Sequence, residues 1–207
     1  LLARYDKERF CILITSAEAG EGKTITCLNL GLVLAELPDR RTAVVDCDLQ
    51  KSNFNSLLNL PPTPGVADVL RDNATVEEAL HATNYDNLFV MPAGVVEQEE
   101  VGELISQPEL EDLITHLRQA YDYVLLDTPP IRVAGVRRSY RESISYSTAG
   151  ILGRTAKDAL LVVRMNKTKR ESVEAALRQL KSAKVRPVGL VLTHQRHVIP
   201  DVLYRLF

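Results

Sequence analysis

The sequence of 207 residues lacks the usual marks of membrane, secreted and nucleic-acid-binding proteins. No apolar run reaches the roughly 18 residues that a transmembrane helix needs, and no signal peptide opens the chain. The formal net charge is only −2, so nothing in the charge balance indicates nucleic acid or an acidic membrane surface as a partner. Internal repeats and low-complexity linkers are also missing. We therefore expect one domain over residues 1–207, and the first residue, Leu1, predicts a fragment of a longer protein.

Cysteine is scarce, and its distribution excludes a common kind of metal or redox site. Cys11, Cys27 and Cys47 are far apart and lie among apolar residues, and the sequence contains no CxxC motif. This pattern favours reduced, buried thiols in a cytosolic protein. His194 and His197 are three residues apart, but a lone histidine pair is weak evidence for a metal site, and we expect none there.

Short segments rich in Val, Ile and Leu alternate with amphipathic segments along the chain. The predicted strands are Phe10–Thr15, Thr42–Asp46, Leu88–Met91, Tyr123–Asp127, Ala159–Arg164 and Val188–Leu192. The predicted helices are Thr24–Glu36, Glu109–Ala120 and Lys169–Ala183. Near-continuous apolar strands are typical of parallel sheets that are covered on both faces. The sequence therefore predicts an α/β fold with a doubly wound, mostly parallel sheet flanked by helices.

The segment Ala17–Thr24, AEAGEGKT, matches the phosphate-binding pattern GxxxxGK[ST] except that Ala17 replaces the first glycine. Glycines at 20 and 22 let backbone N–H groups turn toward phosphate oxygens, and the helix that follows adds its positive end. An accidental turn of small residues is the alternative, but a strand directly before the motif and a helix directly after it favour a phosphate site. The predicted nucleotide contacts are Ala19, Gly20, Glu21, Gly22, Lys23, Thr24 and Ile25.

Acidic residues stand at the ends of two other predicted strands. Asp46 and Asp48 end TAVVDCD, and Asp127 ends YDYVLLD. Because strand periodicity is two, Asp46 and Asp48 are expected on the same face, and ligands of parallel sheets bind beyond the carboxyl ends of the strands. Each aspartate alone could be a structural cap, but together with Thr24 they predict a site for Mg²⁺ and a nucleotide.

The ordered motifs resemble the bacterial tyrosine kinases (BY-kinases) of exopolysaccharide and capsule assembly, which are P-loop relatives of the MinD and ParA ATPases. The resemblance covers almost the whole chain, and it is carried by Ser16–Thr24, Val45–Asp48, Gly65–Leu70, Met91–Gly94, Gly102–Leu117 and Tyr121–Pro130. Partition ATPases usually have an extra lysine at the start of the P-loop. Residues 17–19 are Ala, Glu and Ala instead, which favours the kinase branch.

The resemblance implies ATP and Mg²⁺ as cofactors and assigns roles to individual residues. Lys23 and Thr24 are expected to bind phosphate and metal. Asp46 would activate the acceptor tyrosine hydroxyl or help to hold the metal, while Asp48 and Asp127 would organise Mg²⁺ and its water molecules. The expected catalytic residues are thus Lys23, Asp46 and Asp48, and the expected metal ligands are Thr24, Asp46 and Asp127.

The resemblance further implies an ATP-dependent protein-tyrosine autokinase that regulates exopolysaccharide or capsule synthesis and export. Its expected partners are ATP and ADP, the cytoplasmic segment of a membrane-spanning activator, and further copies of the chain, but no nucleic acid. The expected location is the cytoplasm, at the inner face of the bacterial plasma membrane. Two alternatives stay open: a non-catalytic, ATP-binding regulator or scaffold of polysaccharide assembly, and a positioning ATPase of the MinD/ParA type.

Several positions depart from the family pattern. Gln50 and Ser52 stand where Arg and Pro are usual, Thr148 replaces an Asp, and Thr193 replaces an Asn that often contacts adenine in relatives. Compared with the motif pattern of the family, the segment 131–147 is longer by roughly a dozen residues.

Two further segments have structural predictions of their own. Arg132–Tyr146 is rich in arginine and has no sustained apolar face, which predicts a surface loop near the rim of the site. It is expected either to have no function or to offer arginines to phosphates or a tyrosine as acceptor. Val198–Phe207 carries an apolar stripe that predicts a terminal helix docked on its own domain; docking on a partner or on a membrane is the alternative.

Overall fold

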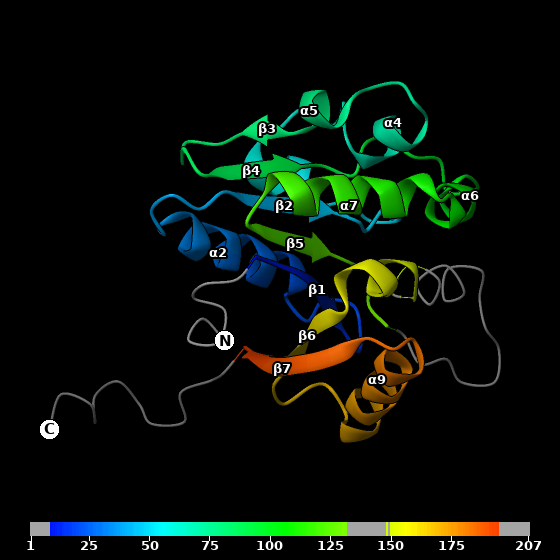
Figure 1. Ribbon diagram of the computed structural model, residues 1–207. Coiled ribbons are helices and arrows are strands. Elements are labelled where there is room, and N and C mark those ends of the chain that lie inside the picture. Colours follow the sequence, from blue (N-terminus) through cyan, green and yellow to red (C-terminus); the bar gives the residue numbers. More distant parts are fainter. Residues whose placement is uncertain (1–8, 132–147, 149, 195–207) are drawn as a thin grey trace, which may run out of the picture.

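The computed structural model describes residues 9–131, 148 and 150–194, and these form a seven-stranded sheet with helices on both faces (Figure 1). The strand order is β3-β4-β2-β5-β1-β6-β7, and every neighbouring pair is parallel except β3 and β4. The strands are β1 (Phe10–Ser16), β2 (Thr42–Asp46), β3 (His81–Ala82), β4 (Leu88–Met91), β5 (Tyr123–Asp127), β6 (Asp158–Arg164) and β7 (Arg186–Thr193). The labelled helices are α2 (Lys23–Ala35), α3 (Phe54–Leu58), α4 (Val66–Leu70), α5 (Val76–Ala79), α6 (Val101–Ser106), α7 (Glu109–Ala120) and α9 (Arg170–Ser182).

The predicted α/β architecture is confirmed, and each predicted strand and helix is present to within two residues at either end. The two-residue strand β3 and the short helices α3 to α6 were not predicted. They are too short to show a hydrophobic period, because four to six residues complete hardly more than one helical turn. The expected loop at 132–146 and the expected helix at 198–207 lie outside the described residues. No helix in the described part of the chain combines the length and apolarity needed to cross a membrane.

One face of the sheet is covered by α2 and α3. Cys27 and Leu34 of α2 pack on strand residues of this face such as Ile14, Val44 and Leu125. Phe54 is fully buried in the same cluster and fastens α3 to the sheet. The face therefore places the first turn of α2 and the whole of α3 beside the carboxyl ends of the central strands.

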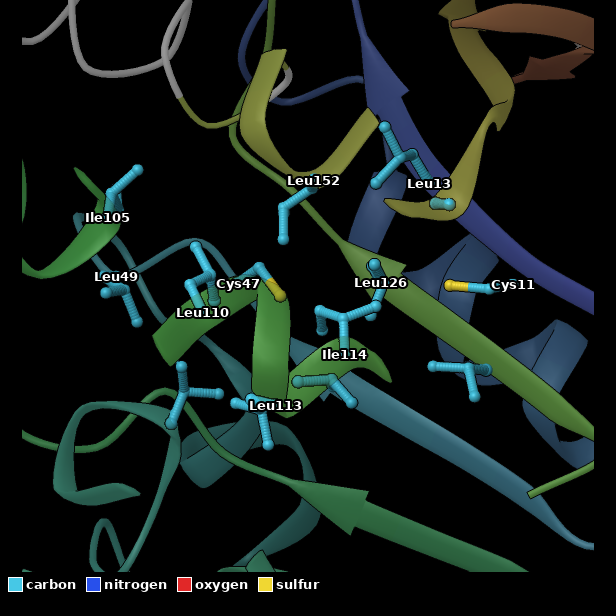
Figure 2. Packing of buried hydrophobic residues seen from close by; sticks show 14 of the residues in the cluster. Cys11, Leu13, Cys47, Leu49, Ile105, Leu110, Leu113, Ile114, Leu126 and Leu152 are labelled. Atoms are coloured by element: carbon cyan, nitrogen blue, oxygen red, sulfur yellow. The ribbon is translucent and has the colours of Figure 1, made fainter. Parts of the chain in front are cut away.

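The opposite face is covered by α4, α6, α7, a helical stretch at 150–156, and α9. Leu110, Leu113 and Ile114 of α7 point into the centre of this layer, where Figure 2 shows them near Cys47 and Leu126. A leucine or isoleucine side chain contributes roughly 1.5–3 kcal/mol to the free energy of unfolding when it is fully buried. The buried face of α7 is therefore a main source of stability. All three cysteines are buried free thiols, as the sequence predicted.

The strand order explains how motifs far apart in the sequence come together. β5 lies between β2 and β1, so the segments that follow these three strands emerge side by side at one edge of the sheet. Asp46 at the end of β2 is in register with Asp127 at the end of β5. Both strands run in the same direction, and their last side chains therefore point to the same face. This is the face that carries α2.

Gly65 is required by a close approach of two backbone segments. A Cβ atom at this position would lie 2.4 Å from the Gly94 nitrogen and 2.5 Å from the Pro92 oxygen. Val66 and Ala67 donate backbone hydrogen bonds to the oxygens of Pro92 and Ala93, at 2.8 and 2.9 Å. The start of α4 is thereby fastened to the segment that follows β4, and only glycine leaves room for the contact.

We expect Gly65→Ala to lower the free energy of unfolding by about 1–3 kcal/mol, because backbone atoms cannot move aside as a flexible side chain can. Gly150→Ala is the matched control: nothing lies within 4 Å of its Cβ position, and alanine favours a helix. The control should leave stability unchanged or raise it by up to about 1 kcal/mol. Urea denaturation of the three proteins measures both effects, and equal midpoints would contradict the contact.

Candidate functional site

The P-loop connects β1 to α2 and presents backbone N–H groups at the edge of the sheet. Gly20 and Gly22 have φ values of 75° and 93°, in the left-handed region where other residues are strained. No side chain caps the N-terminus of α2. The first N–H groups of a helix have no acceptor within the helix, so those at the start of α2 are available to an anion.

An open cleft of about 430 Å³ lies over the P-loop. It is lined by Ala19, Gly20, Gly22, Lys23, Thr24, Ile25, Asp48, Gln50, Lys51, Asn53, Ser56, Leu57, Gln98, Pro129 and Pro130. Of the residues predicted to contact the nucleotide, all except Glu21 line this cleft. The volume lies within the range of small-molecule sites.

Glu21 has a different place, because its side chain turns away from the cleft and is only 2% exposed. Its carboxylate accepts hydrogen bonds from the backbone N–H groups of Glu18, at 2.7 Å, and Arg164, at 3.2 Å, and from the Thr168 hydroxyl. A second link joins the Glu18 carboxylate to the Ser172 hydroxyl, at 2.9 Å. The P-loop is thus hydrogen-bonded to the end of β6, to the segment that follows it and to the first turn of α9. Glu21 could therefore contact a nucleotide only through its backbone.

Thr193, where relatives often have an adenine-contacting Asn, supports the P-loop from behind. Its hydroxyl donates a hydrogen bond to the Glu21 carbonyl oxygen, at 2.7 Å. A Cβ atom at Gly22 would lie 3.5 Å from the Thr193 methyl group, so the end of β7 packs directly under the loop. The side chain of Thr193 therefore holds the backbone of the P-loop in position.

Asp46 and Asp127 lie beneath the cleft at 1% and 2% exposure. The two Asp46 oxygens accept hydrogen bonds from the Asp48 N–H, at 3.0 Å, and from the Ser52 hydroxyl, at 2.7 Å. Asp127 is hydrogen-bonded to the Thr24 side chain. Its Oδ1 atom is buried and has no hydrogen-bond partner among the described residues.

Burial governs the protonation of both carboxyls. It raises the pKa of Asp46 to about 8, and the neighbouring Asp127 carboxylate adds to the rise, while the bonds from Ser52 and the Asp48 N–H oppose it. Burial also raises the pKa of Asp127 to about 6, against the lowering effects of the Thr24 hydrogen bond and the Lys23 amine. Two adjacent buried acids therefore favour bound protons or a bound cation at this point.

Asp48 borders the cleft, but not for the reason that strand periodicity suggested. β2 ends at Asp46, and Asp48 lies in the turn beyond it, so the alternation of side chains along a strand does not place it. Its Oδ1 accepts a hydrogen bond from the Lys51 N–H, at 3.2 Å. Burial raises the pKa of Asp48, and the nearby Lys23 amine opposes the rise. Asp48 is thus the most accessible of the three predicted carboxylates.

The residues of the site are suited to an Mg²⁺ ion that is bound jointly by the protein and by the phosphates of a nucleotide. No group of three or more His, Cys, Asp or Glu side chains in the described part of the chain could hold a metal ion by itself. Mg²⁺ usually keeps several water molecules and binds through one or two carboxylates plus substrate phosphates. The Thr24 hydroxyl and the unpartnered Asp127 oxygen supply the hard oxygen ligands that such a site needs.

The chain is similar in sequence and fold to known proteins. Residues 10–137 match the family described as an AAA domain. The tyrosine-protein kinase YwqD of Bacillus subtilis (strain 168) is 30% identical over 194 residues, which cover 94% of this chain and 76% of YwqD. The VpsO kinase domain superposes with a TM-score of 0.80 at 27% identity, covering 95% of this chain and 90% of that chain. MinD of Pyrococcus horikoshii, complexed with Mg-ADP, superposes with a TM-score of 0.69 at 26% identity, covering 96% and 77%.

Fold and site together define an α/β nucleotide-binding protein of the P-loop class. Within that class the chain belongs to the bacterial tyrosine kinase (BY-kinase) family. It spans only 23% of the length of one curated relative, the tyrosine-protein kinase Wzc of Salmonella typhimurium, to which it is 27% identical over 87% of its own length.

The sequence analysis did not predict the residues whose hydrogen bonds hold the side chains of the site in position. Ser52 was noted only as a departure from the family, yet its hydroxyl holds one oxygen of Asp46. Thr168 was not singled out, although its hydroxyl binds the Glu21 carboxylate. Neither contact has a sequence signal: the bond from Ser52 depends on the shape of the turn after β2, and the bond from Thr168 joins segments 147 residues apart that the folded sheet brings together.

We expect Lys23→Met to weaken ATP binding by roughly 10- to 100-fold, since a charge-assisted hydrogen bond is worth about 1.5–3 kcal/mol. The melting temperature should change little, because methionine can occupy the partly apolar path of the lysine side chain. Lys181→Met, on the exposed side of α9, is the control. Isothermal titration of both variants with Mg-ATP tests the site, and an unchanged affinity of the Lys23 variant would refute it.

The raised pKa of Asp46 predicts how stability depends on pH in the metal-free protein. A carboxyl whose pKa rises from 3.8 to about 8 on folding favours the folded state at low pH and loses that contribution as the pH passes through 8. Asp46→Asn should therefore raise the melting temperature at pH 8 by several degrees, at roughly 2–4 °C per kcal/mol, and much less at pH 4. Thermal melts across this range in EDTA measure it; parallel curves for both proteins would show that Asp46 does not titrate in this way.

Proposed function

We propose that this protein is an ATP-dependent, Mg²⁺-requiring protein-tyrosine kinase. The observation that carries the proposal is the convergence of the Lys23-Thr24 pair with the buried carboxylates of Asp46 and Asp127 at the ends of adjacent strands. Membership of the bacterial tyrosine kinase family and the name of the relative YwqD support the same conclusion. A kinase of this kind needs a phosphate cradle, a metal site and an acceptor for the phenol proton, and residues for each line one cleft or lie directly beneath it.

The chain's own groups bind and orient the triphosphate. Backbone N–H groups of the P-loop and the Lys23 amine would contact the phosphate oxygens. Thr24 and Asp127 would hold Mg²⁺, which when bound neutralises charge that develops on the β- and γ-phosphates. The link from Glu21 to the segment after β6 keeps the loop in this shape without placing a carboxylate against the phosphates.

Transfer requires a carboxylate next to the acceptor hydroxyl. The phenol oxygen bonds to the γ-phosphorus, the bond from that phosphorus to the β–γ bridging oxygen breaks, and ADP leaves. The phenol has a pKa of about 10, so a carboxylate need only accept its proton late in the step. Asp46 is the acceptor expected from the family, whereas Asp48 borders the cleft directly and is the second candidate.

The wider role is proposed from the family alone. We infer that the kinase regulates exopolysaccharide or capsule synthesis and export, that it forms homo-oligomers, and that a cytoplasmic segment of a membrane-spanning protein activates it. It would then work in the cytoplasm at the inner face of the plasma membrane.

Incubation with γ-labelled ATP, Mg²⁺ and a tyrosine-containing peptide separates the candidate functions. We expect label on the tyrosine of the peptide or of the protein. Free phosphate without phosphotyrosine would indicate a positioning ATPase, and binding without turnover would indicate a regulator or scaffold. Asp46→Asn and Asp48→Asn are compared in the same assay. The variant of the proton acceptor should lose transfer by at least about 100-fold while keeping ATP affinity within a few fold.

A further inference from the structure

The cleft over the P-loop has an apolar wall that phosphate binding does not explain. Ile25, in the first turn of α2, and Leu57, in α3, both line the cleft and are 49% and 48% exposed. Pro129 and Pro130 extend the same lining. Phosphates and Mg²⁺ take polar and charged ligands, so these side chains serve a different part of a bound molecule.

The position of the apolar wall relative to the expected phosphate site shows which part of a bound molecule it would contact. Thr24 and Asp127 would mark the γ-phosphate end of the site, because they are the residues that would hold Mg²⁺, whose charge is needed at the β- and γ-phosphates. Asp48, Leu57 and Pro129 all line the cleft, and they follow β2 and β5, the adjacent strands that end in Asp46 and Asp127. Leu57 therefore belongs to the side of the cleft where these carboxylates would meet the γ-phosphate. The base of an extended nucleotide lies at the other end of its triphosphate. Adenine is therefore not the group that covers Leu57.

We propose that Ile25 and Leu57 form the wall against which the ring of the acceptor tyrosine packs. The proposal rests on the kinase function above and names residues that recognise its second substrate. A tyrosine side chain has an apolar ring and a polar hydroxyl, and the cleft offers an apolar wall beside Asp48 and Lys23. Phe54, fully buried in the core, fixes α3 and so holds Leu57 in place before the substrate arrives.

The test compares how a substitution at Leu57 changes the KM for the peptide and the affinity for Mg-ATP. For a peptide with a single tyrosine, Leu57→Ser should raise KM about tenfold, the effect of losing roughly 1.4 kcal/mol of contact. The affinity for Mg-ATP should stay within twofold. Leu57→Met keeps the apolar contact and should restore the KM. Val33→Ser is the matched control, because Val33 is 48% exposed on the same helix as Ile25 but does not line the cleft.

A second peptide, in which phenylalanine replaces the tyrosine, tests ring binding without transfer. It should inhibit the wild-type protein competitively with the tyrosine peptide, and Leu57→Ser should weaken this inhibition by the same factor as the KM. An unchanged KM in Leu57→Ser, an equal loss of ATP affinity, or a changed oligomer mass in solution would each overturn the proposal and leave the kinase function standing. A wild-type protein that binds Mg-ATP but labels no tyrosine would overturn the kinase function itself, and this proposal with it.

Discussion

The parallel pairing of β2 with β5 is the interaction on which the site depends. It puts Asp46 in register with Asp127 and turns both side chains toward the N-terminus of α2. Because β5 also pairs with β1, the P-loop emerges directly beside the two carboxylates. A shift of one residue in either register would turn one aspartate to the opposite face of the sheet and separate it from Thr24.

Two buried carboxylates side by side are unfavourable in a protein that contains neither a cation nor extra protons at that point. Burial raises the pKa of Asp46 to about 8 and that of Asp127 to about 6; the Asp127 carboxylate adds to the rise at Asp46, and the Asp48 carboxylate adds to the rise at Asp127. A divalent cation shared between the protein and a triphosphate would attract both carboxylates and so offset the cost of burying their charges. The arrangement thus lowers the stability of the empty fold, and the proposed binding of Mg²⁺ together with a nucleotide would remove this unfavourable contribution.

The P-loop keeps its shape because several distant segments hold it. Glu21 connects it to the segment after β6, Thr193 supports it from the end of β7, and Thr15 fixes the end of β1 to the Pro129 carbonyl oxygen, at 3.0 Å. These contacts hold the backbone of the P-loop in place beside the cleft. In consequence the anion-binding surface is formed before a ligand arrives, and little conformational entropy is lost on binding. The apolar wall at Leu57 is held in a similar way by the buried ring of Phe54.

The long elements and the chemistry of the motifs follow from the sequence alone. Strands such as Thr42–Asp46 and the helix Glu109–Ala120 have local patterns strong enough to be read directly, and GEGKT has the glycines and the Lys-Thr pair that phosphate binding needs. Three features could be seen only in the fold: Glu21 turns inward, Ser52 donates a hydrogen bond to Asp46, and Leu57 lines the cleft. Glu21 and Leu57 are positioned by contacts between segments that the sheet order brings together, whereas the bond from Ser52 to Asp46 depends on the shape of the turn after β2. Local periodicity carries no information about either kind of contact.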